Sequence, residues 1–167
     1  KAAFYLANGR FSQVVGSYYG RKYFGPKAKA DVEHMVHTMI RIYQERLEKN
    51  TWLSYETRQK AITKLNTLGI HVGYPEKIPA YYDKVITKTK EAGGTLIENA
   101  LAFSRIVRED NFSKYGQEKD RDEWEMSAAT VNAYYHPFLN VIVFPAAILQ
   151  APFYSLEQSA SVNYGGI

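Results

Sequence analysis

The sequence predicts a mainly helical protein with one small antiparallel β-hairpin near its C-terminus, an α+β fold class. Three observations support this prediction: apolar residues recur at helical spacing over 31–47, a helix-capping pattern stands at 95–98, and two strand-like runs separated by a short loop follow residue 128. Of 167 residues, 46% are hydrophobic and 23% are charged. This balance is typical of a chain that folds around a core and not of a disordered one.

The stripe over 31–47 predicts the first amphipathic helix, which Gly25-Pro26 begin and Asn50-Thr51 end. Its expected buried side consists of Val32, Met35, Val36, Met39, Ile40, Tyr43 and Leu47. A second helix follows a short corner and pairs with the first as an antiparallel neighbour. Ser54 is its expected N-cap and Gly69 its stop. The expected buried side of the second helix consists of Tyr55, Ala61, Ile62, Leu65 and Leu68.

Shorter elements complete the prediction. Residues 70–75 are β-branched and end in proline, so we expect a short extended piece there. Thr95 and Glu98 form a capping box that begins a third helix, which ends near residue 111, with Leu96, Ala100, Phe103 and Val107 as its apolar stripe. The hairpin is predicted from runs 128–135 and 141–144.

A formal net charge of +4 raises the possibility of nucleic-acid binding. The stretch 18–27 interleaves basic and aromatic residues, as single-strand binders do. The other basic residues are scattered among acidic ones, however, so we favour a helix whose aromatic residues pack inward while Arg21 and Lys22 stay in solvent. The residues expected to face inward are Val14, Val15, Tyr18, Tyr19 and Tyr23.

Several classes of function are excluded by composition or spacing. The chain has no cysteine, which rules out disulfides and thiol chemistry and favours a reducing compartment. No apolar run reaches the roughly 18 residues of a membrane span, so no membrane association is expected. His34 and His37 are three residues apart, not four, and lie off the apolar stripe, so we expect both to be exposed and not metal-binding. No catalytic and no metal-binding residue is therefore assigned.

Asn132 is unusual because asparagine is depleted in strands, yet it lies in the middle of a predicted one. Its amide offers two hydrogen-bond donors and an acceptor, which predicts a bond either to the chain's own backbone or to a ligand.

Three ordered series of residues then indicate a known family. Residues 131–135 (VNAYY), the motif N-x-I-x-FPA-x-ILQ-x-PF over 140–153, and NYGGI at 163–167 closely resemble the neprilysin family of zinc metallopeptidases. Similar pieces occur upstream, including Thr51-Trp52 and residues 72–75, so the resemblance covers most of the chain and is densest after residue 122.

The resemblance implies how substrate is held. In this family the Asn-Ala strand borders the active-site cleft and pairs with extended peptide, which places Asn132 and Ala133 on the peptide backbone as an added strand. Positions that match Ile148 and Phe153 line an apolar pocket for the side chain after the cleaved bond. The expected ligand of the full-length enzyme is therefore a short peptide, with no nucleic acid.

In the family, NYGGI is followed by a His-Glu-x-x-His helix that binds zinc, and this chain stops before it. We therefore expect a fragment of a two-domain zinc metalloendopeptidase, inactive alone and without bound zinc, from a cytoplasmic, bacterial-type enzyme. Residues 1–73 are expected to belong to the helical lid and cleft wall, 74–94 to the crossing between domains, and 95–167 to the catalytic domain. The alternative is a stand-alone helical module that binds nucleic acid or a protein partner.

Overall fold

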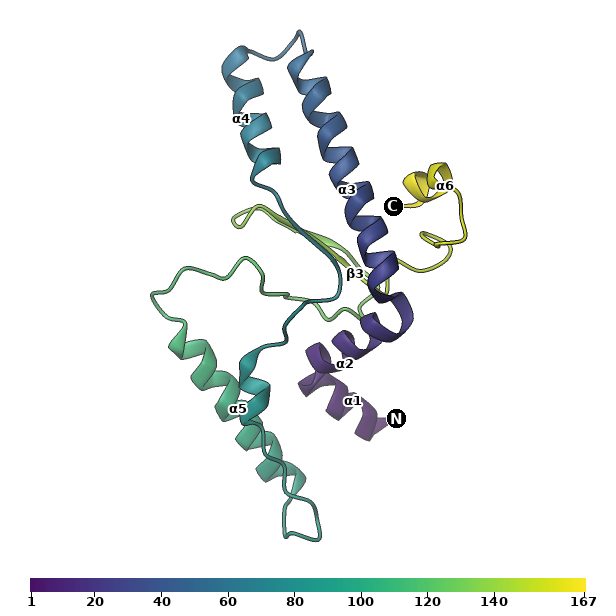
Figure 1. Ribbon diagram of the computed structural model, residues 1–167. Coiled ribbons are helices and arrows are strands. Elements are labelled where there is room, and N and C mark those ends of the chain that lie inside the picture. The colour runs from purple at the N-terminus through teal and green to yellow at the C-terminus, as the bar shows by residue number, and fades with distance from the viewer.

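The longest element is α3, Gly25–Glu48, which runs through the middle of the molecule (Figure 1). A computed structural model describes the backbone of residues 1–167 and every side chain except those of residues 2 and 3. The N-terminal part of the predicted stripe is confirmed, because Val32, Met35 and Val36 are buried on one side of α3, but the expected inward position of Tyr43 is wrong, because its side chain is exposed. Gly25, at φ 78°, and the following proline begin the helix six residues earlier than the apolar pattern shows.

The second predicted helix is α4, Tyr55–Asn66, antiparallel to α3 (Figure 1). The predicted cap is confirmed, since Oγ of Ser54 accepts a hydrogen bond from the backbone N–H of Thr57 at 3.2 Å. The expected inward position of Tyr55 is wrong, because its side chain is exposed. α4 packs only against α3 and the edge of the sheet, so no side chain of this described helix is fully buried.

The N-terminal helices are α1, Ala2–Arg10, and α2, Ser12–Tyr19, followed by a π-helical turn, Gly20–Phe24. The expectation that Val15, Tyr18 and Tyr23 face inward is wrong, because all three are exposed. Gly16 and Gly20 are buried in their place. The glycine face approaches its neighbours closely: a Cβ at Gly16 would lie 2.3 Å from Oγ of Ser127, and one at Gly20 would lie 2.6 Å from the ring of Tyr74. Close backbone approach thus decides how α2 faces the core.

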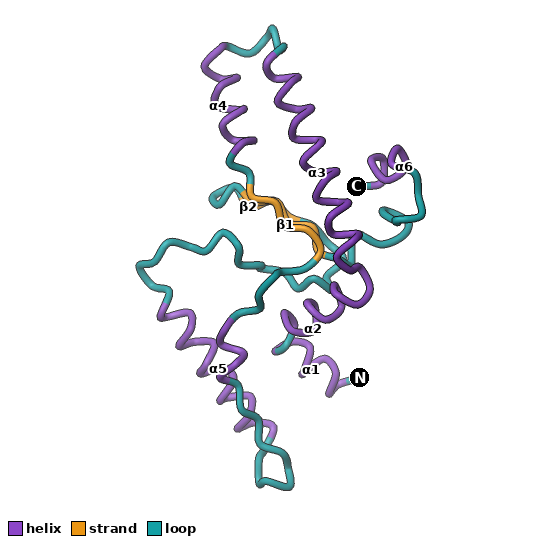
Figure 2. The backbone as a smooth tube through the Cα atoms, viewed as in Figure 1, coloured by secondary structure: helices purple, strands orange, loops and turns teal.

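Three strands form a mixed sheet in the order β1-β3-β2 (Figure 2). β1, Gly69–Gly73, is parallel to β3, Val141–Pro145, and β2, Tyr134–His136, is antiparallel to β3. The β2–β3 hairpin was predicted, but its first strand is shorter than expected. Ala128 is buried and its carbonyl oxygen accepts from the backbone N–H of Ala147 at 3.0 Å, so residues 128–133 bend toward the turn after β3 and do not follow β3.

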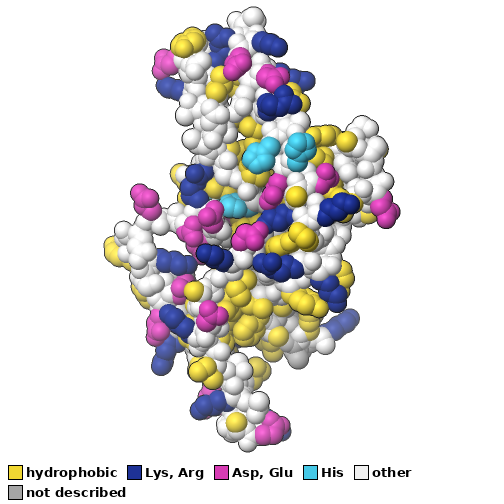
Figure 3. Space-filling view, in the orientation of Figure 1, with side chains coloured by type: hydrophobic (Ala, Val, Ile, Leu, Met, Phe, Trp, Pro, Cys, Tyr) yellow, Lys and Arg dark blue, Asp and Glu magenta, His cyan; other side chains and the backbone are white. Residues whose placement is uncertain are grey.

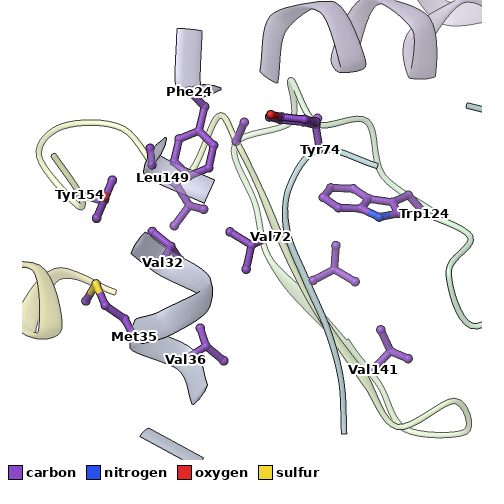
Figure 4. Close-up of a cluster of buried hydrophobic side chains, with 14 residues drawn as sticks. Phe24, Val32, Met35, Val36, Val72, Tyr74, Trp124, Val141, Leu149 and Tyr154 are labelled. Atoms are coloured by element: carbon purple, nitrogen blue, oxygen red, sulfur yellow. The ribbon is translucent and has the colours of Figure 1, made fainter. Parts of the chain in front are cut away.

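The sheet has a buried side chain on each face. Register and strand alternation put Val72 on one face and Val143 on the other. Figure 4 shows Val72 directed toward Val32 and α3, with Trp124 on the other side of the strands. Trp124 is buried and anchors the charged segment 119–123 to the core. The core is therefore one cluster to which α3, the sheet and the segment around Trp124 all contribute.

The third predicted helix is α5, Leu96–Ser113, and both bonds of its capping box are present. α5 lies beside the short 3₁₀ helix Ala80–Lys84 (η2), away from the sheet (Figure 1). Its predicted stripe is only half-buried, and Leu96 is exposed. The chain ends with α6, Ala160–Gly166. In the part of the chain that the structure describes, no helix combines the length and apolarity required for crossing a membrane.

Candidate functional site

The edge strand β2 is the feature of the candidate site that backbone topology alone establishes. β2 pairs with β3 on one side only, with Tyr134 opposite Val143 and His136 opposite Val141. Within the described structure no strand lies on its other side, so this edge presents backbone groups that a further strand can bind. β2 contains three residues, and Asn132 and Ala133 directly precede it in the chain.

Asn132 and Ala133 are both exposed, directly before β2. The backbone N–H of Asn132 donates to the carbonyl oxygen of Thr130 at 3.0 Å, and the N–H of Ala133 donates to Oδ1 of Asn132 at 2.8 Å. The amide side chain is therefore bonded to its own backbone through its oxygen, one of the two possibilities that the sequence left open. Its Nδ2 has no hydrogen-bond partner among the described residues, so this donor is available to a ligand.

Ile148 and Phe153 follow β3 and are held in different ways. Ile148 lies in a turn and packs partly against the core, and its backbone N–H donates to the carbonyl oxygen of Pro145 at 3.2 Å. Phe153 has 47% of its surface exposed. The bond from Ala147 to Ala128 joins this turn to the segment that leads into Asn132, but the described contacts do not bring the side chains of Ile148 and Phe153 to Asn132.

The run 163–167 (NYGGI) has a structural role. Asn163 is buried, and its amide bonds both backbone groups of Ser155: Nδ2 donates to the carbonyl oxygen at 2.9 Å, and Oδ1 accepts from the N–H at 3.2 Å. A Cβ at Gly166 would lie 2.1 Å from the carbonyl oxygen of Phe153. Asn163 and Gly166 thus hold the segment that carries Phe153 against α6. Composition alone did not reveal this structural role.

Two cavities lie near the sheet. The larger, about 1180 Å³, has a mixed lining in which charged residues stand beside apolar ones such as Ile70, Val72 and Trp124. The smaller, about 380 Å³, is mainly apolar and lies between α3, α4 and the sheet, where Tyr135 and Ile142 line it. None of the four predicted substrate-binding residues lines either cavity.

The surroundings of β2 shift the pKa values of two neighbouring side chains, Tyr134 and Glu125. Burial raises the pKa of Tyr134, so its phenol stays protonated at neutral pH. A hydrogen bond from Lys119 holds the pKa of the Glu125 carboxyl below its usual value, so that carboxylate stays charged beside β2. Nδ1 of His136 accepts from the backbone N–H of Leu139 at 3.2 Å, and its Nε2 lies 3.6 Å from Oε1 of Glu125.

The described residues contain no group of three or more His, Asp or Glu side chains placed to hold a metal ion. His34 and His37 are exposed on α3, as their positions off the apolar stripe predicted. The chain's own residues therefore do not fit a zinc site, and no step of the chemistry is assigned to them.

The basic and aromatic stretch 18–27 has an internal explanation. Nζ of Lys22 lies over the exposed rings of Tyr18 and Tyr23, at 5.5 and 5.4 Å from their centroids. Arg21 lies over Tyr74 at 5.1 Å, and Lys29 at 4.7 Å. These cation–π contacts pair the basic residues of the stretch with its own aromatic rings and with Tyr74.

Comparison with known proteins identifies the family. Two family models described as peptidase family M13 match residues 1–75 and 132–167. A neutral endopeptidase of Lactococcus lactis subsp. lactis is 54% identical over 162 residues, which are 97% of this chain and 25% of that protein. Human neprilysin is 34% identical over 163 residues, which are 96% of this chain and 22% of that protein.

A solved structure gives the same result. The crystal structure of PEPO from Lactobacillus rhamnosis HN001 superposes with a TM-score of 0.85 at 42% identity, over 96% of this chain and 25% of that one. The chain thus spans about a quarter of the length of the relatives that it matches. Since both family models, the sequence relatives and the superposed structure agree, this chain belongs to peptidase family M13, the neprilysin family.

Proposed function

We propose that this chain is the substrate-binding part of a zinc-dependent metalloendopeptidase that cleaves short peptides, and that the free edge of β2 binds extended substrate. Family membership and relatives named neutral endopeptidase support the reaction class. The observation that carries the substrate-binding role is the unpaired β2 edge with the exposed Asn132 beside it. The zinc ligands lie outside this chain in this proposal, which assigns it no chemical step.

Proline determines which backbone groups of β2 face a peptide. Residues of an antiparallel pair alternate between positions that exchange two hydrogen bonds and positions that exchange none. Pro137 has no N–H, so the pairing of His136 with Val141 requires the hydrogen-bonded type, and Tyr134 opposite Val143 is then of the same type. The backbone N–H and C=O of Tyr135 consequently point to the free edge. Sequence analysis missed this position, although Pro137 was a usable signal.

The proposed contacts are few. The backbone groups of Tyr135 and Nδ2 of Asn132 provide two or three hydrogen bonds, each contributing about 0.5 to 1.5 kcal/mol net. Their sum is at most about the 4 kcal/mol of a millimolar complex, before the cost of ordering the peptide. We therefore expect no measurable peptide binding and no hydrolysis by the 167-residue chain alone. Zinc-dependent hydrolysis by the purified chain would contradict this.

The test of the β2 role is Asn132→Ala in the full-length enzyme. Removing the free donor should lower kcat/KM toward peptides about five- to tenfold, the effect of losing one hydrogen bond, with zinc content unchanged. Asn66→Ala is the matched control, since it also removes an exposed asparagine amide, but on α4. An unchanged kcat/KM for Asn132→Ala, measured by peptide hydrolysis with zinc analysis, would remove Asn132 from the site.

The second part of the proposal assigns Ile148 and Phe153 to an apolar pocket for the side chain after the cleaved bond. Phe153→Ala should reduce the preference for bulky over small residues at that position about tenfold. Leu156→Ala is a matched control, because Leu156 lies on the same segment with 45% of its surface exposed. Equal selectivity changes in the two variants would contradict a pocket role for Phe153.

The proposal also assigns the segment between the two domains of the full-length enzyme. Residues 74–94 cross between the lid and the catalytic domain, and a closed chamber between these domains restricts the enzyme to short peptides.

A further inference from the structure

The loop that closes the β2–β3 hairpin ends in a residue with unusual backbone geometry. Asn140 has a φ of 52°, in the left-handed region that asparagine and glycine tolerate best. Its Nδ2 donates to the carbonyl oxygen of Lys64 at 2.8 Å and to Oγ1 of Thr67 at 3.1 Å. Its Oδ1 accepts from the hydroxyl of Tyr135 at 3.0 Å. One amide thus connects the end of α4 to the edge strand.

Arg121 holds the same loop from the segment that precedes Trp124. Its Nε donates to the carbonyl oxygen of Leu139 at 3.0 Å. Its Nη2 donates to the carbonyl oxygens of Thr67 at 2.7 Å and of Asn140 at 3.2 Å. Because a guanidinium donates in a fixed planar geometry, these bonds set the position of the loop as well as its distance from α4.

β2 needs such support because a three-residue edge strand has few ladder bonds of its own. Its two tyrosine hydroxyls supply further bonds. The hydroxyl of Tyr134 accepts from the backbone N–H of Glu125 at 3.0 Å, and that of Tyr135 donates to Asn140. Consecutive strand residues point to opposite faces of a sheet. The strand is therefore held from both faces, and Asn140 is the partner on the α4 side.

From these contacts we propose that Asn140, supported by Arg121, is a positioning residue that keeps the β2 edge in the conformation that pairs with peptide. This inference rests on the proposed function of β2. A strand that is already ordered loses little conformational entropy when a peptide pairs with it. A more mobile strand is in the binding conformation for only part of the time, and the apparent affinity for peptide is reduced by that fraction. Once peptide is bound the chemistry is unaltered, so the effect falls on KM and not on kcat.

The test uses the full-length enzyme. Asn140→Gly removes the amide but keeps a residue that tolerates the positive φ. We expect KM for peptides to rise about five- to tenfold with kcat within about twofold, because one set of side-chain bonds is lost without a change at the reacting groups. Tyr135→Phe removes only one hydroxyl and should raise KM about threefold. In the double variant the two effects should not add, since the bond that Tyr135→Phe removes is one of those that Asn140→Gly removes.

The matched control is Asn66→Ala, which removes an amide whose Oδ1 accepts from Nε2 of Gln44 at 2.6 Å between α3 and α4. This variant should leave KM unchanged even where it lowers stability, so an equal rise in KM would mean that Asn140 acts only through general stability and would overturn the proposal. Additive effects in the double variant would also contradict it. If Asn140→Gly is not recovered folded, Tyr135→Phe decides alone, because backbone and ring stay in place.

Two outcomes separate this inference from the proposed function. If KM is unchanged in Asn140→Gly and Tyr135→Phe while Asn132→Ala still lowers kcat/KM, the positioning role is wrong and the peptide-binding edge stands. If Asn132→Ala also leaves kcat/KM unchanged, both the positioning role of Asn140 and the binding role of Asn132 are wrong.

Discussion

α3 and α5 have the same kind of sequence and different surroundings. Both carry apolar residues at helical spacing, and both form the predicted helix. α3 buries its stripe against the sheet, whereas α5 rests on η2 and on a few aromatic rings, such as Phe11 at 5.4 Å and Tyr82 at 6.2 Å from Phe103. Figure 3 shows hydrophobic side chains gathered on the lower part of one face, where α1, α2 and α5 lie. An apolar stripe therefore predicts a helix and its apolar face, but not which segment packs against that face.

The largest expected effect comes from shortening one side chain on each helix. Met35→Ala in α3 should lower the free energy of unfolding by about 2 to 5 kcal/mol, because the side chain is 4% exposed and leaves a cavity. Leu101→Ala in α5, where the side chain is 65% exposed, should cost less than about 0.5 kcal/mol. Urea denaturation of the 167-residue chain measures both. Similar losses would show that α5 is packed as closely as α3.

A second prediction compares two helical glycines. Gly20→Ala should destabilise the chain by about 1 to 3 kcal/mol, because the new methyl group would overlap the ring of Tyr74. Gly9→Ala in α1 has nothing within 4 Å of the new Cβ, so helix propensity should stabilise the chain by about 0.5 to 1 kcal/mol. Thermal unfolding should therefore shift in opposite directions, and shifts of the same sign would refute the close approach at Gly20.

The smallest expected effect is the loss, at low pH, of the stabilisation that the capping box gives to the start of α5. Hydrogen bonds from the hydroxyl and the backbone N–H of Thr95 to Oε2 of Glu98, at 2.8 and 3.0 Å, hold the pKa of this carboxyl below its ordinary value of 4.5. A pKa that is lower in the folded state means that the capping box stabilises α5 above the unfolded pKa. That stabilisation is lost as pH falls through the folded pKa.

Carboxyl ¹³C NMR titration of Glu98 measures this effect. Thr95→Ala should return the pKa of Glu98 toward its ordinary value, while Ser54→Ala, which removes a hydroxyl cap on α4, should leave it unchanged. A Glu98 pKa that does not respond to Thr95→Ala would show that the capping box is not formed in solution.

Local patterns were sufficient for α3, α4 and α5 and for the family. Gly25-Pro26, Ser54 and the Thr95–Glu98 pair act within one turn of chain, so the beginnings of α3, α4 and α5 could be predicted from neighbouring residues. The same holds for the ordered motifs after residue 122, which are sufficient to indicate the family. The peptide-binding roles of Asn132, Ala133, Ile148 and Phe153 stay predictions.

The arrangement of the elements in space depends on contacts between segments that are distant in the sequence. The parallel pairing of β1 with β3, the glycine face of α2 and the partial burial of the α5 stripe all depend on which segments meet in space, and hydrophobic spacing carries no information about that. Asn140 is the clearest case: its amide bonds Thr67, 73 positions away, and its neighbour strand at the same time. The sequence by itself determined these helices, because caps and backbone preferences act over a few residues. Only the tertiary structure determined which elements pack together, because burial and close approach are properties of the assembled chain.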